Sequence, residues 1–317
     1  MKQRFSVAHW GFAFSVLMFG LCMFLFVPVT THYATTVLLI IKAQPPEVSY
    51  VVMNRSGLFS DPDISPLLVT GGTTTSYKAV AQLKDPNGYS DIVAMEMVLY
   101  RAGVTGGSFC LSNPENCYRS SMREGTCASV STSAQAGVLT CTFDLAYWAD
   151  ATIGERTSYG DDFWQLAIQL HDTAGETYIN EQYTNEVDSL LQLRFPEFIN
   201  YGALERGASS PEGSKISVEN IGNVDADVQV RISDLICTVG TIPVQAQRMD
   251  VEQGSFAEMT ARDTSLELSL EPTRYTRIVL PARTTDQPST DDLYWSIQVP
   301  ESGVSGTCEG GGILTGI

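Results

Sequence analysis

The sequence CLSNPENCYRSSMREGTCASVSTSAQAGVLTC, residues 110–141, is the stretch that decides the fold class. It holds four of the seven cysteines, is rich in Ser, Gly and Asn, and leads into a run in which apolar and polar residues alternate. This pattern predicts a loop attached to a β-sheet by two disulfide bonds. Because disulfides persist in oxidising compartments, the stretch also predicts an exported protein.

Four cysteines permit three pairings. We favour Cys110–Cys117 and Cys127–Cys141 because each closes a short loop. Cys237 and Cys308 remain as a third pair, which would tie the C-terminus to a sheet. A zinc site is disfavoured, because zinc ligands usually come in pairs two to four residues apart and the stretch contains no histidine.

The N-terminus has the features of an export segment. Lys2 and Arg4 precede an uncharged apolar run over residues 10–29, and a second apolar patch ends at Lys42-Ala43. In one interpretation, residues 1–43 are a signal peptide cleaved after Ala43. In the other, residues 10–29 form an uncleaved membrane-spanning helix, for which about 20 apolar residues suffice. Both interpretations place the rest of the chain outside the cytoplasm.

The charge limits the class of partner. The chain has a formal net charge of −17, and residues 1–43 contribute bases but no acids. This negative charge repels nucleic-acid phosphate and disfavours an anionic lipid surface. We therefore expect no nucleic-acid partner, and membrane contact only through residues 10–29 if they are not cleaved.

Residues 46–195 alternate apolar and polar side chains in short segments separated by turns. The segments are Tyr77–Lys84, Ile92–Tyr100, Leu139–Tyr147 and Trp164–Leu170. A period of two over this length predicts strands buried on one face. In Ile92–Tyr100 the expected inward residues are Val93, Met95, Met97 and Leu99, and in Leu139–Tyr147 they include Cys141. Without interleaved helices, such strands indicate an antiparallel β-sandwich.

The pattern restarts after Pro196, so residues 196–317 are predicted to form a second β domain. Ile199–Ile216 reads as a short strand and a loop. Ile216 and Val218 then alternate with polar residues, as do Val224–Ile232, and Asn220–Asn223 lies between them. This spacing predicts a β-hairpin. Further strands are expected at Leu266–Leu270 and Leu293–Val299.

Asp85, Asn87 and Asp91 have two interpretations. Their side-chain oxygens at alternating spacing suit Ca²⁺, which takes six to eight oxygen ligands. They also suit a turn, in which Asn-Gly supplies a corner and the aspartates accept hydrogen bonds from backbone N–H groups. Calcium is the one cofactor that the sequence suggests.

The run Asp85-Pro-Asn-Gly-Tyr-Ser-Asp-Ile92 before an alternating strand resembles immunoglobulin-like modules of bacterial and archaeal secreted surface proteins. The resemblance includes residues 100–103, 147–150 and 171–175, and Asn220–Asn223 resembles a turn of such sandwich domains. It implies an all-β chain of two immunoglobulin-like antiparallel β-sandwich domains in tandem, residues 46–195 and 196–317, after an N-terminal hydrophobic export or anchor helix. These motifs are specific to the architecture and do not indicate an activity.

No catalytic signature stands out. His171 is the one histidine after residue 32, no G-x-S-x-G motif occurs, and the cysteines outside the N-terminal segment are expected to be paired. We therefore predict an exported, secreted or cell-surface structural or adhesion protein without enzymatic activity, whose partner is an unknown protein or glycan. The alternative is an extracellular carbohydrate-binding or glycan-processing protein, in which Trp148 and Tyr294 stack on sugars.

Overall fold

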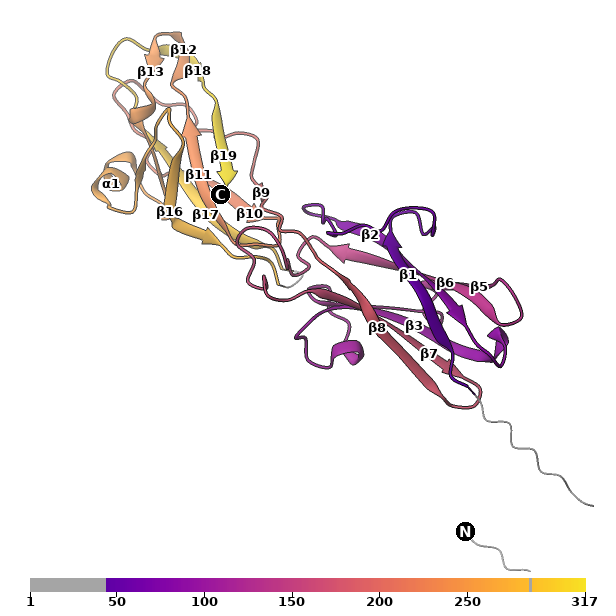
Figure 1. The fold of residues 1–317 in the computed structure, drawn as a ribbon. Helices are drawn as coiled ribbons and strands as arrows, with labels where there is room; N and C mark the ends of the chain where they lie inside the picture. Colours follow the sequence, from indigo (N-terminus) through magenta and orange to yellow (C-terminus); the bar gives the residue numbers. More distant parts are fainter. Residues whose placement is uncertain (1–43, 285–286) are drawn as a thin grey trace, which may run out of the picture. The chain divides into compact units, whose positions relative to one another are not determined.

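The computed structural model describes residues 44–284 and 287–317 (Figure 1). By its contacts, Ala43–Ile317 forms one compact unit. The predicted signal peptide or anchor at residues 1–43 lies outside the described residues. Within the described residues, no helix has both the length and the apolar character needed to cross a membrane. The structure is all-β, with strands assembled into several sheets.

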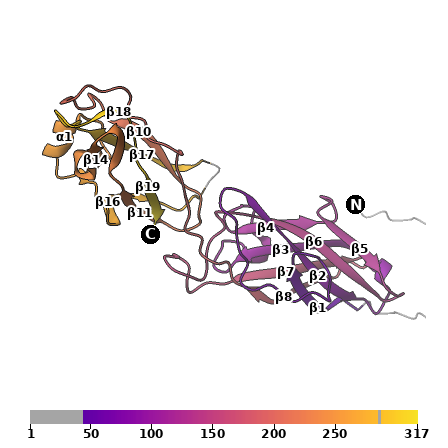
Figure 2. The same cartoon turned by 90° about the horizontal axis from the view of Figure 1, so that it is seen from above.

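The first half of the chain forms two four-stranded antiparallel sheets. One has the order β1-β2-β6-β5 and the other has the order β4-β3-β7-β8. Their bounds are β1 Glu47–Asn54, β2 Thr74–Lys84, β3 Ile92–Arg101, β4 Cys117–Ser121, β5 Cys127–Ser131, β6 Ala136–Ala146, β7 Trp164–Asp172 and β8 Thr177–Asn185. The two sheets lie face to face (Figures 1 and 2) and share one hydrophobic core.

The period-two alternation accounts for this sandwich. On β6 the side chains of Leu139, Cys141, Phe143 and Leu145 are buried, and the residues between them are more exposed. Because successive side chains of a strand point to opposite faces, one face of β6 enters the core. The four strands predicted in this half are confirmed, and Cys141 lies on the inward face as expected.

One predicted inward position is wrong. Val93 is 62% exposed, and Ile92 is buried instead. The register of β3 against β7 shifts between Ile92 and Ala94, which marks a β-bulge. Because a bulge inserts one extra residue, it moves the side chains before it to the other face. The alternation of Met95, Met97 and Leu99 after the bulge holds.

The second half of the chain forms three sheets. Their orders are β15-β14-β17-β10-β9, β16-β11-β19 and β13-β12-β18. The bounds are β9 Leu193–Arg194, β10 Ser214–Asn220, β11 Ala226–Ile232, β12 Leu235–Val239, β13 Thr241–Ile242, β14 Gln247–Asp250, β15 Leu266–Glu267, β16 Thr273–Leu280, β17 Ser289–Ile297, β18 Ser305–Glu309 and β19 Gly312–Gly316. A second hydrophobic core draws on the first two of these sheets, and a smaller one includes Cys237.

The hairpin predicted around residues 220–223 is wrong. β10 pairs with β17 and β9, whereas β11 pairs with β16 and β19. The hydrogen bonds of the buried Asn220 explain why the chain passes from the sheet of β10 to the sheet of β11. Its Oδ1 accepts from the Gly222 N–H, and its Nδ2 donates to the carbonyl oxygens of Val224, Leu280 and Pro281. These bonds hold the connection against the end of β16, so the chain passes from one sheet into another.

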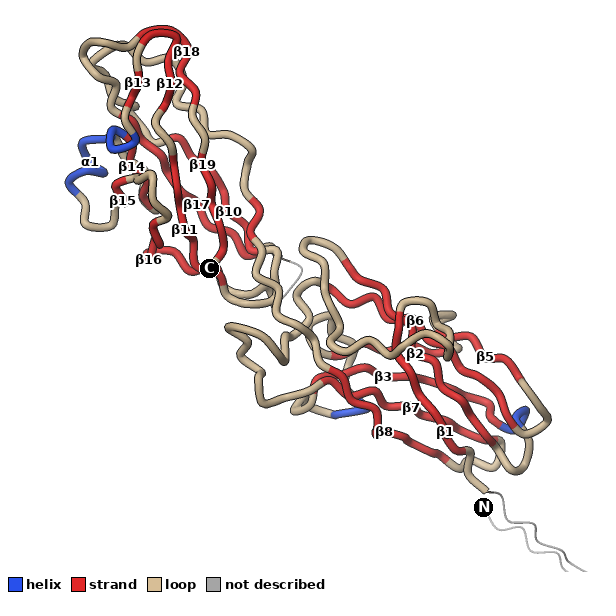
Figure 3. Tube along the Cα trace, turned by 45° about the horizontal axis from the view of Figure 1, so that its top comes forward, coloured by secondary structure: helices blue, strands red, loops and turns tan. Residues whose placement is uncertain are grey.

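Two other details of the second half differ from expectation. The short strand expected near Ile199 does not form. Residues 195–206 are irregular, and the nearest strand is β9, which ends at Arg194. A short helix, α1 at Phe256–Ala261, was not predicted (Figure 3). Its start has a capping box, in which Ser255 and Glu258 exchange side-chain to backbone hydrogen bonds. The division of the chain into domains at residues 195 and 196 stays a prediction.

We expect Phe143→Ala to destabilise the first sandwich by about 3–5 kcal/mol, because it leaves a cavity between the two sheets. Val130→Ala on β5 of the same sheet is the control. Val130 is exposed, so its truncation should change stability by less than about 0.5 kcal/mol. Urea unfolding followed by fluorescence measures both values. Equal effects of the two substitutions would contradict the placement of Phe143 in the core.

Candidate functional site

The first disulfide-closed loop lies against the outer face of the sheet that contains β3 and β7. Cys110 is bonded to Cys117, and both pack with Val98 and Tyr100 of β3. The buried Gln169 of β7 donates from Nε2 to the Ser108 carbonyl oxygen at 2.7 Å. The loop is therefore held from two strands, and β3 is buried on both faces where the loop covers it.

The residues on either side of Cys110 are presented to solvent. Phe109 is 63% exposed and Leu111 is 89% exposed. Arg119 fixes the backbone between them, since its Nη1 donates to the Cys110 carbonyl oxygen at 2.9 Å, while its Nε donates to Glu96. A backbone fixed in this way has little conformational entropy left to lose if these side chains are bound.

The other two disulfides join neighbouring strands. Cys127 on β5 is bonded to Cys141 on β6, and the two residues are direct partners in the antiparallel register. Cys237 on β12 is bonded to Cys308 on β18, again between register partners. The Cys127–Cys141 and Cys237–Cys308 bonds therefore each join two strands of one sheet, and the Cys110–Cys117 bond joins a loop to the start of β4. None of these three bonds joins two facing sheets.

The predicted calcium ligands form a turn. Asp85 is buried, and its Oδ1 accepts from the Asn87 N–H at 2.7 Å. Asn87 donates from Nδ2 to the Gln44 carbonyl oxygen, and Asp91 accepts from the Thr173 hydroxyl. Among the described residues, no group of three or more His, Cys, Asp or Glu side chains is placed to hold a metal ion. The turn interpretation agrees with these bonds, and calcium binding stays a prediction.

The predicted sugar-stacking residues lie on separate elements. Trp148 follows β6, and the guanidinium of Arg283 lies over its ring at 4.3 Å from the centroid. Tyr147 contacts the same indole in an edge-on arrangement at 4.8 Å. Tyr294 is half-buried on β17, between register partners on β10 and β14. Arg283 covers a face of Trp148 that a sugar would need, so glycan stacking gains no support from this geometry.

Next to Trp148, a buried acidic residue anchors the loop that leads into β7. Arg101 donates from Nε to Asp150 Oδ2 at 2.6 Å and also bonds to Asp162, and its guanidinium lies 3.7 Å from the Tyr159 ring centroid. Burial raises the pKa of Asp150 to about 6, and the Arg101 ion pair only partly opposes this shift. The sequence contains no local signal for this cluster, because Arg101 at the end of β3 lies 49 residues before Asp150.

A second polar cluster, also missed from the sequence, holds residues 149–156 and 188–190 against residues 223–227. Asn223 donates from Nδ2 to the carbonyl oxygens of Ala149 and Asp188, and its Oδ1 accepts from the Leu190 N–H. Arg156, with a positive φ of 64°, bonds to Asp227 at 2.8 Å. The hydrogen bond from Arg156 lowers the pKa of Asp227. The Asn220–Asn223 motif therefore holds separate segments together through side-chain hydrogen bonds, and it does not form a hairpin turn.

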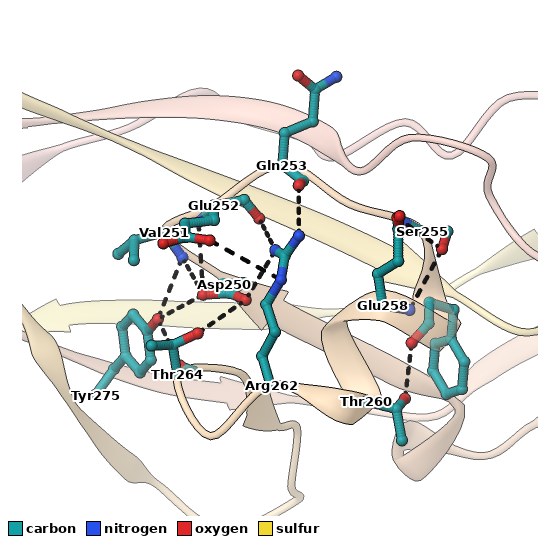
Figure 4. Close-up of polar contacts among 11 residues, drawn as sticks. Asp250, Val251, Glu252, Gln253, Ser255, Glu258, Thr260, Arg262, Thr264 and Tyr275 are labelled. Atoms are coloured by element: carbon teal, nitrogen blue, oxygen red, sulfur yellow. Dashed lines mark hydrogen bonds and ion pairs between the residues drawn. The ribbon is translucent and has the colours of Figure 1, made fainter.

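A third polar cluster surrounds the buried Asp250 at the end of β14 (Figure 4). Its Oδ1 accepts from the Val251 N–H and the Tyr275 hydroxyl, and its Oδ2 accepts from Thr264 and Arg262. Arg262 also donates to the backbone carbonyls of residues 252 and 253. Both carboxylate oxygens are satisfied, so the cluster fixes the segment that carries α1.

Comparisons with known proteins do not assign this chain to a family. No protein-family model matches the sequence, and no curated protein matches it. Dimeric latent PorU from Porphyromonas gingivalis matches with 12% identity and a TM-score of 0.25, over 84% of this chain and 20% of that chain. The 35 kDa C-terminal fragment of the major pilin GBS80 of Streptococcus agalactiae matches with 9% identity and a TM-score of 0.24, over 86% of this chain and 91% of that chain.

The chain spans about one fifth of the PorU chain. At these TM-scores, neither likeness supports an argument about this protein. The β-sandwich is established by its own sheets and core.

Loss of a disulfide should lower the free energy of unfolding by a larger amount when the loop that it closes is longer. In the chain-entropy relation, replacing Cys237 and Cys308 by Ala, which opens a separation of 71 residues, costs about 4 kcal/mol. Replacing Cys110 and Cys117, separated by 7 residues, costs about 2.5 kcal/mol. Urea unfolding of the two double variants measures the difference. The reverse order would contradict this entropic account.

The Asp150 carboxyl should titrate well above the ordinary pKa of an aspartate. With a pKa of about 6 in the folded state against 3.8 ordinarily, the folded protein favours its protonated form. The contribution of Asp150 to the free energy of unfolding therefore falls as pH rises from about 4 to about 6. NMR titration of the side-chain carboxyl carbons, assigned with Asp150→Asn, measures the midpoint. A midpoint near 4 would show that the Arg101 ion pair fully offsets the effect of burial on this pKa, and would contradict the prediction.

Proposed function

We propose that the protein is exported and serves at the cell surface, or in secreted form, as a non-enzymatic structural or adhesion protein. The observation that carries this proposal is the set of three disulfide bonds within the described residues. Reducing compartments keep cysteines as thiols, so stable structural disulfides favour an extracellular location. The N-terminal export pattern of the sequence supports the same location independently.

We further propose that residues 46–195 and 196–317 are two immunoglobulin-like domains. The strand order supports this for the first domain. With β1 to β8 taken as A, B, C, C′, D, E, F and G, its sheets are A-B-E-D and C′-C-F-G. An immunoglobulin constant-type domain has sheets ABED and CFG, so this domain differs by one added edge strand. Separate hydrophobic cores for the two halves support the division into domains.

Adhesion, as opposed to a purely structural role, is supported by the loop closed by Cys110 and Cys117. Leu111 within this loop and Phe109 just before it are exposed to solvent, on a backbone held by Arg119 and Gln169. Rigid apolar side chains of this kind serve as anchors in protein interfaces. The polar clusters around Asp150 and Asp250 make their bonds within the protein, which supports a structural role for both.

Protease treatment of intact cells that express the full chain tests the location. We expect externally added proteinase K to degrade residues 44–317, because they lie outside the membrane. A cytoplasmic protein in the same cells is the control and should survive until lysis. Maleimide labelling without reductant should leave the six cysteines after residue 100 unmodified. Full protection of the chain from protease, together with labelled cysteines, would overturn the proposal.

A further inference from the structure

A cavity in the second half of the chain lies between two extended stretches of backbone. One wall is residues 198–206, which follow β9, and the other is residues 304–310, which include β18. The cavity has a volume of about 950 Å³. A smaller one of about 170 Å³ continues along the same two stretches, and the two cavities share Phe198, Ile199, Tyr201, Leu235 and Gly310. Together they form one groove, which we call the β18–β19 groove.

One wall of this groove is an unpaired sheet edge. β18 is the last strand of the sheet β13-β12-β18, and β19 is the last strand of the sheet β16-β11-β19. Within the described residues, neither has a strand on its second side. Residues 195–206 run beside them as loop (Figures 1 and 3). Unpaired N–H and C=O groups on an edge strand are a template for another strand.

The floor of the groove is apolar. Leu235, Ile242, Ile297 and Val299 line the larger cavity, and Ile232 and Leu314 line the smaller one. These residues belong to the two hydrophobic cores of this half, or pack against them. Phe198 stands at the rim of both cavities and is 74% exposed. An occupant with apolar side chains on one face would extend the cores and cover Phe198.

We propose that the β18–β19 groove binds an extended peptide segment of another protein, which adds as a strand to the free edge of β18. An unpaired edge supplies main-chain hydrogen bonds, and pockets beside it select alternate side chains, as in β-strand addition. β18 has five residues and spans about 16 Å at 3.3 Å per residue, so about five residues of a segment can pair along it. The inference goes beyond the proposed surface role and does not depend on it.

The charge decides between a foreign segment and a second copy of this chain. Glu197 and Glu309 line the groove, and Arg206 is the one basic residue among the lining residues. The whole chain has a formal net charge of −17. Two copies therefore repel each other, whereas an apolar segment with basic residues at its ends is attracted. The chemistry of the occupant is a β-forming apolar segment with basic flanks.

Two synthetic peptides test this proposal. The first is KVTVTVK, in which valines alternate between basic ends, and the second is KVTPTVK, whose central proline lacks an N–H and disfavours a continuous strand. We expect the first to bind and the second to bind about tenfold more weakly or less, as measured by fluorescence anisotropy at low salt. Equal binding of both peptides would indicate unspecific attraction and would overturn the proposal.

A blocking variant places the binding in the groove. Ala203 lines the larger cavity and is exposed, so Ala203→Trp fills the groove without changing a core. It should weaken the binding of KVTVTVK by about tenfold. Ala257→Trp, at an exposed position on α1 outside the groove, is the matched control and should bind like the original chain. Binding that Ala203→Trp leaves unchanged would overturn the proposal.

Hydrogen–deuterium exchange tests strand addition directly. With KVTVTVK bound, amides of residues 305–309 should exchange more slowly, and amides of β1 and β8 should not change. Unchanged exchange at residues 305–309 despite binding would overturn strand addition. Sedimentation of the protein alone should show a monomer. A concentration-dependent dimer that Ala203→Trp abolishes would show that the occupant is a second copy and would overturn the assignment to a foreign segment.

Discussion

Burial of alternate side chains between facing sheets is the constraint on which the rest of this structure depends. A strand that contributes Leu139, Cys141, Phe143 and Leu145 to one core cannot shift by one residue without exposing all four. Register is thereby fixed along β6, and through it along β2 and β5. The disulfide between Cys127 and Cys141 adds a covalent link between positions that the register already makes neighbours. Loops of irregular sequence can then vary on a rigid scaffold.

The same constraint explains which features could be predicted from the sequence. The four main strands of the first half follow from their alternation, because burial on one face leaves a visible period. Val93 shows the limit, since a bulge moves one residue without changing the local composition. The alternation of apolar and polar residues also does not determine which strand a given strand pairs with. β10 and β11 both alternate and are close in sequence, yet the bonds of the buried Asn220 direct them into different sheets.

The candidate sites were harder to predict, because they depend on residues far apart in the chain. Trp148 looks like an exposed aromatic in the sequence, but Arg283 covers its ring. Arg101 and Asp150 meet across separate elements, as do Asn223 and Ala149. A local signal exists for α1, which was not predicted: Ser255 and Glu258 have the spacing of a capping box, which marks the start of a helix. The long-range contacts have no such local signal.

The exposed loop and the β18–β19 groove would recognise partners by different physical means. Phe109 and Leu111 offer exposed apolar side chains on either side of Cys110, whose carbonyl is held by Arg119, so recognition there depends on a complementary apolar pocket. β18 offers main-chain groups, which every extended peptide can pair with, so specificity there must come from the apolar floor and from Glu197 and Glu309. A sandwich edge left open is normally a risk of aggregation. The negative charge of this chain keeps identical edges apart, and so an open edge can persist for a partner of opposite charge.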